Sequence, residues 1–282
     1  MIGFIGLGTM GLPITQNILK AGKELSFYAR RDEVIQTARA MGGRFCSTIE
    51  ELGARCQVVI FFLNTAEQCR ECLEKLLTEM RTGTIIIGST MSPEDCAELD
   101  TICKEKGITL LDAPVSGGVQ GAIDGTLTVM VSGDAKAFAQ YQPLLELYAQ
   151  KVAYVGEKPG MAQTLKAINQ QLVGINVVSV CEAFALGMRC GIDAQVIADT
   201  IPFCAGTSRI FENRSKYIIQ RNFEKRSSLQ IQLKDLRICR HLAEMAGITL
   251  PVASVCEKIY EEALTFCDPS EDTIAVLKTY ER

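Results

Sequence analysis

Residues 160–191 read GMAQTLKAINQQLVGINVVSVCEAFALGMRCG, and this stretch divides the chain into two parts of different character. It contains no proline and is apolar nearly all round, which predicts a long helix that packs on most of its sides. Near its start, Lys166 is followed by Asn169 and Gln170 at helical spacing, so the three side chains share one face. A lysine beside two amides on such a helix indicates a functional site, although a surface lysine on the first turns gives the same pattern.

Upstream of this stretch, the chain opens with a pattern that is typical of dinucleotide binding. Apolar residues 2–5 predict a buried strand, GLGTMG follows at residues 6–11, and a helical pattern comes next. In this context Gly6 permits a tight turn, Gly8 lets the backbone approach a diphosphate, and Gly11 lets the helix pack on the strand. The residues expected to hold the diphosphate at the helix start are Gly6, Leu7, Gly8, Thr9, Met10 and Gly11.

The second predicted strand, Leu25 to Tyr28, ends at residues that choose between two dinucleotides. A carboxylate in this place would bind the adenosine ribose hydroxyls of NAD. The chain has Arg30 and Arg31 here, and two guanidinium groups suit the 2′-phosphate of NADP. NADP is therefore the preferred cofactor, and NAD is the alternative because Asp32 follows directly.

Strands and helices alternate up to residue 160, which predicts an α/β fold whose parallel sheet is covered on both faces. At the ends of two strands, Leu63 with Asn64 and Ser89 with Thr90 are expected to line the cofactor cleft. Only helical patterns remain afterwards, so we expect residues 1–160 to form a dinucleotide-binding domain and residues 161–282 an all-helical domain. The other predicted strands cover residues 58–63, 84–87, 108–112, 126–132 and 151–155, and the other predicted helices cover residues 12–20, 65–80, 93–106, 135–147, 193–200, 208–219, 229–246, 251–264 and 273–280.

The composition argues against several other classes of protein. The 282 residues carry a net charge of −4, which gives no electrostatic case for a nucleic-acid partner. Residues 172–188 are as apolar as a membrane span, but Asn176, Ser179 and Glu182 interrupt them, so a buried helix is the better interpretation. The twelve cysteines are scattered singly through apolar segments, which favours reduced thiols in a cytoplasmic protein.

Metal chemistry and histidine-based catalysis have little support in this sequence. The close cysteine pair, Cys69 and Cys72, lacks the second pair of ligands that a zinc site needs, so we expect no metal. The single histidine, His241, lies in a helical pattern far from any carboxylate motif. Lys166 is therefore the best candidate for a general acid or base.

A second glycine motif, DAPVSGG at residues 112–118, follows a predicted strand. Ser116 offers a hydroxyl, and Gly117 and Gly118 leave backbone amides unobstructed, which suits a small carboxylate ligand, although a plain turn uses the same residues. Residues 119–124 are expected to form a loop beside the substrate pocket. Farther along, Lys234 places a cation in an otherwise apolar helical pattern.

Four motifs together resemble the β-hydroxyacid dehydrogenase family: GLGTMG, DAPVSGG, GMAQTLKAINQ at residues 160–170 and LKD at residues 233–235. They come in the family's order and spacing along essentially the whole chain. The family includes 3-hydroxyisobutyrate dehydrogenase, tartronate semialdehyde reductase and L-threonate dehydrogenase, and residues 205–214 (AGTSRIFENR) are most similar to the branch that contains the last of these. The chain departs from the family at Ala162, where a glycine is usual, and at Ala29, where an asparagine is usual.

The resemblance implies an N-terminal Rossmann domain, a long interdomain helix and a helical C-terminal domain that builds a homodimer or homotetramer. By motif position, Lys166 matches the catalytic lysine, which acts as general acid and base while a short hydroxy acid and its oxo acid or semialdehyde interconvert. An imine reductase on the same scaffold is disfavoured because that group usually lacks this lysine, and a non-catalytic dinucleotide-binding scaffold is the alternative outside enzymes. The residues that match the substrate site are Ser116, Gly117, Gly118, Asn169, Gln170 and Lys234, and Lys234 would also contact the nicotinamide of the cofactor.

Overall fold

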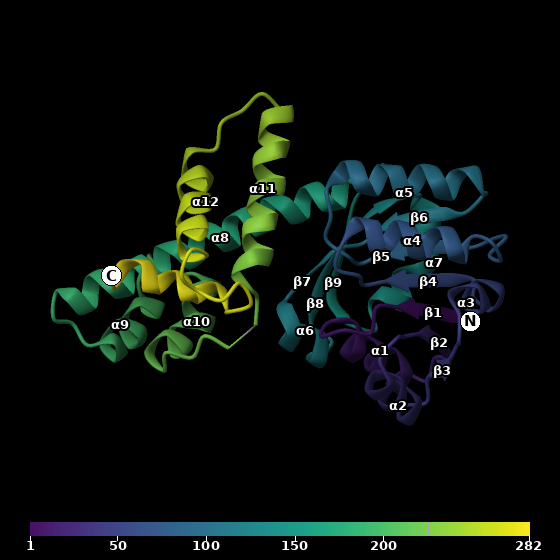
Figure 1. Cartoon of the computed structure of the whole chain (residues 1–282), viewed down its shortest axis with the longest axis horizontal. Coiled ribbons are helices and arrows are strands. Elements are labelled where there is room, and N and C mark those ends of the chain that lie inside the picture. Colours follow the sequence, from purple (N-terminus) through teal and green to yellow (C-terminus); the bar gives the residue numbers. More distant parts are fainter. Residues whose placement is uncertain (225) are drawn as a thin grey trace. The chain divides into compact units, whose positions relative to one another are not determined.

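The computed structural model of the chain describes residues 1–224 and 226–282. They form two compact units, Met1–Lys166 and Ala167–Arg282. The first unit is built on a sheet with helices and the second on helices (Figure 1). One long helix, α8 (Met161–Arg189), contributes residues to both.

A single nine-stranded sheet forms the centre of the first unit, all of whose residues are described. Its strands are β1 Ile2–Ile5, β2 Leu25–Tyr28, β3 Arg44–Phe45, β4 Val58–Phe61, β5 Thr84–Ile87, β6 Thr109–Asp112, β7 Val115–Ser116, β8 Leu127–Gly133 and β9 Ala149–Gly156. They lie in the order β3-β2-β1-β4-β5-β6-β8-β7, with β9 paired to β8. The strands from β3 to β6 are parallel, as the alternation of strands and helices predicted. β8 runs antiparallel to β6 and β7 and parallel to β9.

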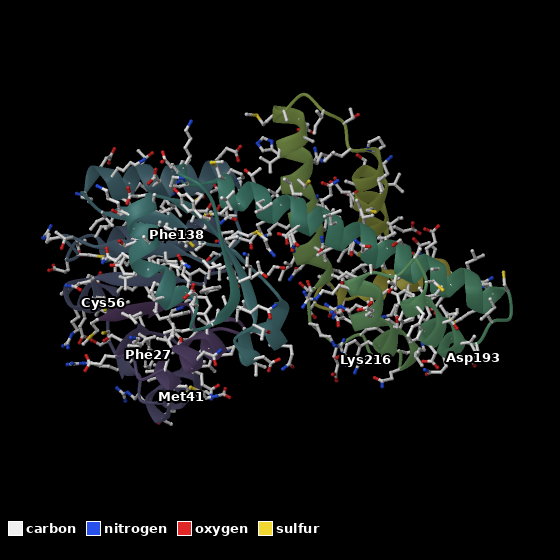
Figure 2. The ribbon with its side chains drawn as sticks, turned by 180° about the vertical axis from the view of Figure 1, so that it is seen from behind. Phe27, Met41, Cys56, Phe138, Asp193 and Lys216 are labelled. Atoms are coloured by element: carbon white, nitrogen blue, oxygen red, sulfur yellow. The ribbon has the colours of Figure 1, made fainter. Side chains whose placement is uncertain are left out.

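Helices cover both faces of this sheet because its central strands bury side chains on both sides. On β1, Phe4 packs in a core with residues of α1, α2 and α7, whereas its neighbour Ile5 packs in a second core with residues of α3, α4 and α5. Phe138 of α7, labelled in Figure 2, also packs against the sheet. Its ring stacks on Tyr154 of β9 with ring centroids 4.8 Å apart. The helices are α1 Gly11–Lys20, α2 Asp32–Ala40, α3 Ile49–Arg55, α4 Ala66–Leu76, α5 Pro93–Glu105, α6 Gly118–Asp124 and α7 Ala135–Leu145.

The chain reverses its direction of winding between β1 and β4. From β1 it builds β2 and β3 on one side of the sheet, and it then returns to build β4, β5 and β6 on the other side. Open parallel sheets of this kind bind their ligands at the carboxyl edge where the winding reverses. The topology therefore assigns the ends of β1 and β4 to the centre of a possible ligand site.

The described part of the second unit is helical, as predicted. Its core contains Val177, Cys181 and Phe184 of α8 together with Phe211 and Tyr260. The remaining elements are α9 Ala194–Thr200, α10 Arg209–Ile219, α11 Leu229–Met245, α12 Pro251–Ala263 and the 3-10 helices η1 Ile201–Phe203 and η2 Thr273–Tyr280. One side of α8 packs in this core, but Leu165, Ile168, Leu172 and Leu186 of the same helix are exposed, so the expected packing on most of its sides is not found within the chain. Within the described ranges α8 is the helix that by length and a mean hydropathy of 1.5 could cross a membrane, and 39% of that apolar window is buried.

The pattern gave no prediction for the short elements β3, β7 and η1, and four other local features also differ from the sequence-based expectation. Residues 273–280 form a 3-10 helix instead of an α-helix, and the N–H of Ala275 donates to the carbonyl three residues back at 2.8 Å. Residues 119–124, expected to be a loop, lie in the short helix α6. The pattern gave no prediction for α2 or for α3, although Thr48 caps α3 by accepting from the N–H of Glu51, and the Glu51 carboxylate accepts from the N–H of Ser47 at 2.8 Å.

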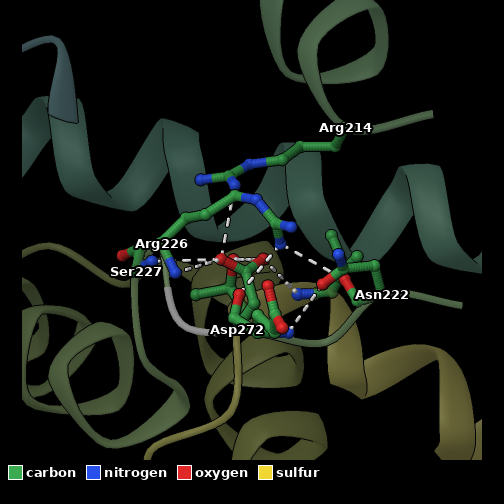
Figure 3. Close-up of polar contacts among 8 residues, drawn as sticks. Arg214, Asn222, Arg226, Ser227 and Asp272 are labelled. Carbon is green, nitrogen blue, oxygen red and sulfur yellow. Dashed lines mark hydrogen bonds and ion pairs between the residues drawn. The ribbon is translucent and has the colours of Figure 1, made fainter. Parts of the chain in front are cut away.

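A buried carboxylate, Asp272, ties the loop before α11 to the start of η2 (Figure 3). The N–H groups of Arg226 and Ser227 each donate to its Oδ2 at 3.0 Å. Arg214 Nη1 lies 3.3 Å from the same oxygen, and the N–H of Ile274 donates to Oδ1 at 3.3 Å. These contacts fix the segment that leads into α11, the helix that carries Lys234.

Replacing Asp272 with alanine is expected to lower the free energy of unfolding by about 3 kcal/mol, because buried donors and a half-buried guanidinium lose their partner. Urea unfolding followed by circular dichroism measures the change. Asp268→Ala is the matched control, since Asp268 accepts from the N–H of Ser270 at an exposed site. A similar loss in both variants would contradict the role given to Asp272.

Candidate active site

Apart from Lys234, which belongs to α11 of the second unit, the predicted cofactor residues lie where parallel strands of the first unit end. They are residues 6–11 after β1, Arg30 and Arg31 after β2, Leu63 and Asn64 after β4, and Thr90 after β5. Because these four strands are adjacent and parallel, the residues share the carboxyl edge of the sheet on both sides of the winding reversal. The sheet thus brings four separate stretches of sequence to one place.

The three glycines of the first motif are not equivalent. Gly6 has a φ of +97°, and a methyl group there would collide with the carbonyl oxygen of Phe62. A methyl group at Gly11 would collide with the carbonyl oxygen of Gly6, but one at Gly8 would meet no heavy atom within 4 Å. The fold itself requires glycine at Gly6 and Gly11. At Gly8 it does not, so the open backbone there fits close approach by a ligand such as a diphosphate.

Helix α1 begins beside Gly8 without a side-chain cap on its first amides. Four other helices of this unit have such a cap, supplied by Thr48, Thr65, Ser92 and Asp134. At this helix start the N–H of Leu12 donates to the carbonyl of Gly8 at 3.0 Å and Pro13 has no N–H, so an anion would meet the N–H groups before Leu12 and the positive end of the helix dipole. The open backbone at Gly8 and the uncapped start of α1 therefore fit the diphosphate of a dinucleotide together.

Arg30 and Arg31 are both exposed just beyond the end of β2. Throughout residues 1–224 and 226–282, neither guanidinium forms an ion pair with a carboxylate. The neighbouring Asp32 is the first residue of α2. Both arginines are therefore available to an anionic group of a ligand at the edge of the sheet.

Ser89 and Thr90 differ from one another in exposure. Ser89, expected to line the cleft, is buried, and its hydroxyl accepts a hydrogen bond from the N–H of Leu63 at 2.7 Å. Cys69 Sγ lies 3.6 Å from the same hydroxyl oxygen. Ser89 thus joins the loop after β4 to the loop after β5, whereas the half-buried Thr90 keeps an exposed side.

The second glycine motif turns the chain from β7 into α6. Ser116 pairs with Thr128 of β8, and Gly117 and Gly118 have φ values of +130° and +66°. These angles alone account for both glycines. A methyl group at Gly118 would meet nothing within 4 Å, so its backbone is also open to a ligand.

Lys166 lies on the second turn of α8 and is 7% exposed. The first turn of that helix is held by side chains from two strands. Asp112, the last residue of β6, accepts from the N–H groups of Gly160 at 3.0 Å and Gln163 at 3.1 Å. Ser132 of β8 accepts from the N–H of Ala162 at 3.0 Å. Three amides before Lys166 are thereby bonded to the sheet.

These side chains also bond to one another. Ser132 Oγ donates to Asp112 Oδ2 at 3.1 Å, and Gln163 Nε2 donates to Oδ1 at 2.7 Å. Gln163 reaches the loop after β5 as well, since it donates to the carbonyl of Ser89 at 2.9 Å and accepts from the N–H of Met91 at 3.1 Å. Burial raises the pKa of the Asp112 carboxyl, and hydrogen bonds from Gln163 and Gly160 act in the opposite direction.

The remaining predicted residues lie in the second unit, where Asp235 of α11 joins them. Gln170 Nε2 donates to Asp235 Oδ2 at 2.7 Å, and Lys234 Nζ lies 3.2 Å from Oδ1 as an ion pair. Asn169 Nδ2 donates to Gln170 Oε1 at 3.0 Å. In addition, Gln232 Nε2 donates to the carbonyl of Gln170 at 2.9 Å, so α11 is bonded to α8 on both sides of Lys234.

Five polar residues of these networks were not among the predicted site residues: Asp112, Ser132, Gln163, Gln232 and Asp235. Asp112 and Ser132 each lie near the end of an apolar strand, where a polar residue is a signal of a ligand site or a buried bond. Gln163 and Asp235 are each within three residues of a predicted lysine. The motifs contained them, but their partners are too distant in sequence to be inferred.

Two family models match the chain. The model described as the NAD binding domain of 6-phosphogluconate dehydrogenase matches residues 1–156. The model described as NAD-binding of NADP-dependent 3-hydroxyisobutyrate dehydrogenase matches residues 160–280.

Individual proteins are similar over the same range. L-Threonate dehydrogenase of Cupriavidus necator is 35% identical over 283 residues, which cover 99% of this chain and 95% of that protein. 2-(Hydroxymethyl)glutarate dehydrogenase of Eubacterium barkeri is 30% identical over 286 residues, which cover 100% of this chain and 95% of that protein. The crystal structure of 3-hydroxyisobutyrate dehydrogenase from Salmonella typhimurium superimposes with a TM-score of 0.91 at 30% identity and covers 99% of each chain.

Gly8, where a methyl group would meet no protein atom, and Gly11, where it would collide with the backbone, predict different outcomes on substitution to alanine. Gly8→Ala is expected to keep the melting temperature within about 2 °C and to weaken dinucleotide binding at least about 10-fold, because the methyl group occupies ligand space only. Gly11→Ala is expected to lower the free energy of unfolding by about 2 kcal/mol or more through overpacking. Calorimetric titration and thermal unfolding measure both. Unchanged affinity in Gly8→Ala would remove this loop from the cofactor site.

Proposed function

The chain belongs to the β-hydroxyacid dehydrogenase family, and we propose that it interconverts a short hydroxy acid and its oxo acid or semialdehyde with NADP, using Lys166 as general acid and base. The family makes it an NAD(P)-dependent oxidoreductase that acts on a small molecule. Its relatives named above act on L-threonate and 2-(hydroxymethyl)glutarate, so a hydroxyl group and a carboxylate on a short carbon chain define the substrate class.

The observation that carries this proposal is the buried lysine itself. Lys166 is 7% exposed, and the turn before it is bonded to the strands that end at the cofactor edge. A lysine held in a fixed place by such bonds suits a group that releases and accepts a proton at one substrate atom. The nicotinamide supplies the hydride chemistry when it is bound. Lys166 would take the hydroxyl proton during oxidation and return it during reduction.

The other predicted residues have roles that follow from their chemistry. Ser116 with the open backbone of Gly118 would hold the substrate carboxylate through a hydroxyl and amide hydrogen bonds. Gln170 and Lys234, both in contact with Asp235, would provide a donor and a cation for the substrate, and Lys234 would also contact the nicotinamide. Asn169 supports Gln170 through their hydrogen bond.

NADP is proposed over NAD because of the charge at the end of β2. A 2′-phosphate carries negative charge that two exposed guanidinium groups can neutralise with bidentate hydrogen bonds. A ribose 2′-hydroxyl would need a carboxylate acceptor at the same place. The cofactor residues of this proposal are residues 6–11, Arg30, Arg31, Leu63, Asn64, Thr90 and Lys234.

Residues 1–160 are proposed as the dinucleotide-binding domain and residues 161–282 as the substrate and oligomerisation domain, since the two family models meet between residues 156 and 160. The proposed assembly is a homodimer or homotetramer in the cytoplasm. The alternatives are an imine reductase and a non-catalytic NADP-binding scaffold. The buried lysine favours hydroxy acid chemistry over both, because a scaffold would gain nothing from the desolvation of an amine.

Steady-state turnover tests the proposal. Purified protein is assayed with NADP and with NAD against three- and four-carbon hydroxy acids and their semialdehydes, with nicotinamide absorbance as the signal. Turnover on at least one pair, faster with NADP, is expected. Absence of turnover across the panel, with dinucleotide binding still detected by calorimetry, would favour the scaffold reading.

Lys166→Ala is expected to lower kcat at least about 10²-fold, the typical contribution of a positioned acid or base, and to keep the Kd for NADP within about threefold. Lys158→Ala, at an exposed lysine just before α8, is the matched control and should behave as wild type. Near-normal turnover of Lys166→Ala would remove this lysine from the mechanism.

The double variant Arg30→Ala/Arg31→Ala is expected to lower kcat/KM with NADP by about 10²-fold and with NAD by less than about threefold, since charge-assisted hydrogen bonds to the phosphate are lost. Arg44→Ala removes another exposed arginine, at β3, and serves as control. Equal losses of kcat/KM with both cofactors would show that the two arginines do not bind the 2′-phosphate.

A further inference from the structure

Four hydrogen bonds converge on the carboxylate of Asp112, which is 0% exposed. Its Oδ2 accepts from the N–H groups of Gly160 and Gln163 and from the hydroxyl of Ser132, and its Oδ1 accepts from Gln163 Nε2. A buried carboxylate is costly unless donors of this kind surround it. Two of the four donors are main-chain groups at the start of α8, so the carboxylate serves as a cap for that helix.

This cap differs from the other helix caps of the first unit. The caps of the other helices, supplied by Thr48, Thr65, Ser92 and Asp134, each precede the helix that they cap, so their bonds are local and do not join that helix to a distant strand. Asp112 is 48 residues before Gly160 and 51 before Gln163. Its bonds therefore fix the start of α8 to the end of β6.

Two further side chains extend this attachment to neighbouring strands. Ser132 accepts from the N–H of Ala162 and donates to Asp112, which ties the helix to β8. Gln163 bonds to the main chain at Ser89 and Met91, which ties it to the loop after β5. The helix start is thus held by strands on both sides of β6 in the sheet order.

Lys166 follows Ala162 by four residues and Gln163 by three, so it lies one helical turn beyond both and on the same face. Any shift of the first turn relative to the sheet moves the lysine by a similar amount. The loops after β4 and β5 belong to the cofactor edge, and Ser89 bonds both to Leu63 and to Gln163. One hydrogen-bonded chain therefore runs from the edge of the sheet to the turn that carries Lys166.

We propose that Asp112 is a positioning residue, which holds the amine of Lys166 in register with the carboxyl edge of the sheet through the first turn of α8. This inference rests on the proposed role of Lys166 as general acid and base. The reaction requires donor and acceptor atoms within hydrogen-bond reach, and a displacement of about 1 Å costs about 10²-fold in rate. Asp112 touches neither substrate nor cofactor in this role.

Asp112→Asn tests the proposal because it keeps the size of the side chain and turns one acceptor oxygen into a donor. The asparagine oxygen can still accept from the donors at the Oδ2 position, but its amide nitrogen would then face Gln163 Nε2, where only an acceptor fits. The matched control is Asp134→Ala, which removes the local cap of α7, a helix with no site residue. Ser132→Ala is a milder second variant that removes one bond to the carboxylate and one to Ala162.

Three measurements are made on each variant. Steady-state kinetics with titration calorimetry separate kcat from KM and from the Kd for NADP. Hydrogen exchange with mass spectrometry follows the amides of residues 160–163. The rate at which a small imidate amidinates Lys166, read on its tryptic peptide, reports the exposure of the amine. The last two readouts require no turnover.

Asp112→Asn is expected to lower kcat about 10- to 10²-fold, to leave KM and the Kd for NADP within about threefold, and to speed both exchange and amidination of Lys166. Ser132→Ala should show the same changes at smaller size. Asp134→Ala should show none of them, even where its melting temperature falls by as much as that of Asp112→Asn. If Asp112→Asn does not accumulate as folded protein, the same measurements on Ser132→Ala decide whether the proposed positioning role holds.

Wild-type exchange and amidination in these variants would overturn the positioning role, and so would a loss of kcat that the Asp134→Ala control shares. A wild-type protein without turnover on the substrate panel would instead overturn the proposed function. In that case faster amidination of Lys166 in Asp112→Asn would still support the attachment of the lysine to the sheet, and an unchanged rate would overturn it.

Discussion

The structure of the first unit depends on the burial of both faces of a parallel sheet. Consecutive residues such as Phe4 and Ile5 on β1 belong to two different cores, so the central strands have no face left for a ligand. Polar chemistry is confined to the edges, and the reversal of winding between β1 and β4 opens the carboxyl edge at one place. Each residue of the proposed cofactor site in this unit stands at a strand end for this reason.

The N–H groups at the helix starts along this edge find their hydrogen-bond partners in different ways. The difference distinguishes helix starts that are completed by the protein from one that can receive a ligand. α4 and α5 begin with local side-chain caps, in which Thr65 accepts from the N–H of Gln68 and Ser92 accepts from the N–H of Asp95. α1 begins without a side-chain cap beside the open backbone of Gly8. The start of α8 is completed by Asp112 from a remote strand. An uncapped start can receive an anion, whereas a remotely capped start is fixed to its partner.

The sequence predicted features that local patterns determine. β1, β2 and β5 were predicted with the residues that the structure gives them, because short apolar runs next to glycines or charges leave little choice. Local patterns could not reveal the antiparallel direction of β8 or the 3-10 form of η2, which depend on pairing and packing with distant residues. Among the site residues, glycines and lysines stood out by type, whereas Asp112 and Gln163 gain their importance from bonds across 51 positions.

Capping a helix with a buried carboxylate carries a desolvation cost. An apolar side chain at residue 112 would remove the desolvation cost, and such replacements of buried charges are often neutral or stabilising in other proteins. It could not, however, accept from Gly160, Gln163 and Ser132 at once, and the N–H groups at the start of α8 would lose their partners. The four donors fix both oxygens of Asp112, so only one arrangement of β6, β8 and α8 satisfies them together. The proposed acid-base role of Lys166, one turn further along the helix, requires such an arrangement, because in that role its amine would meet a reacting oxygen within hydrogen-bond distance.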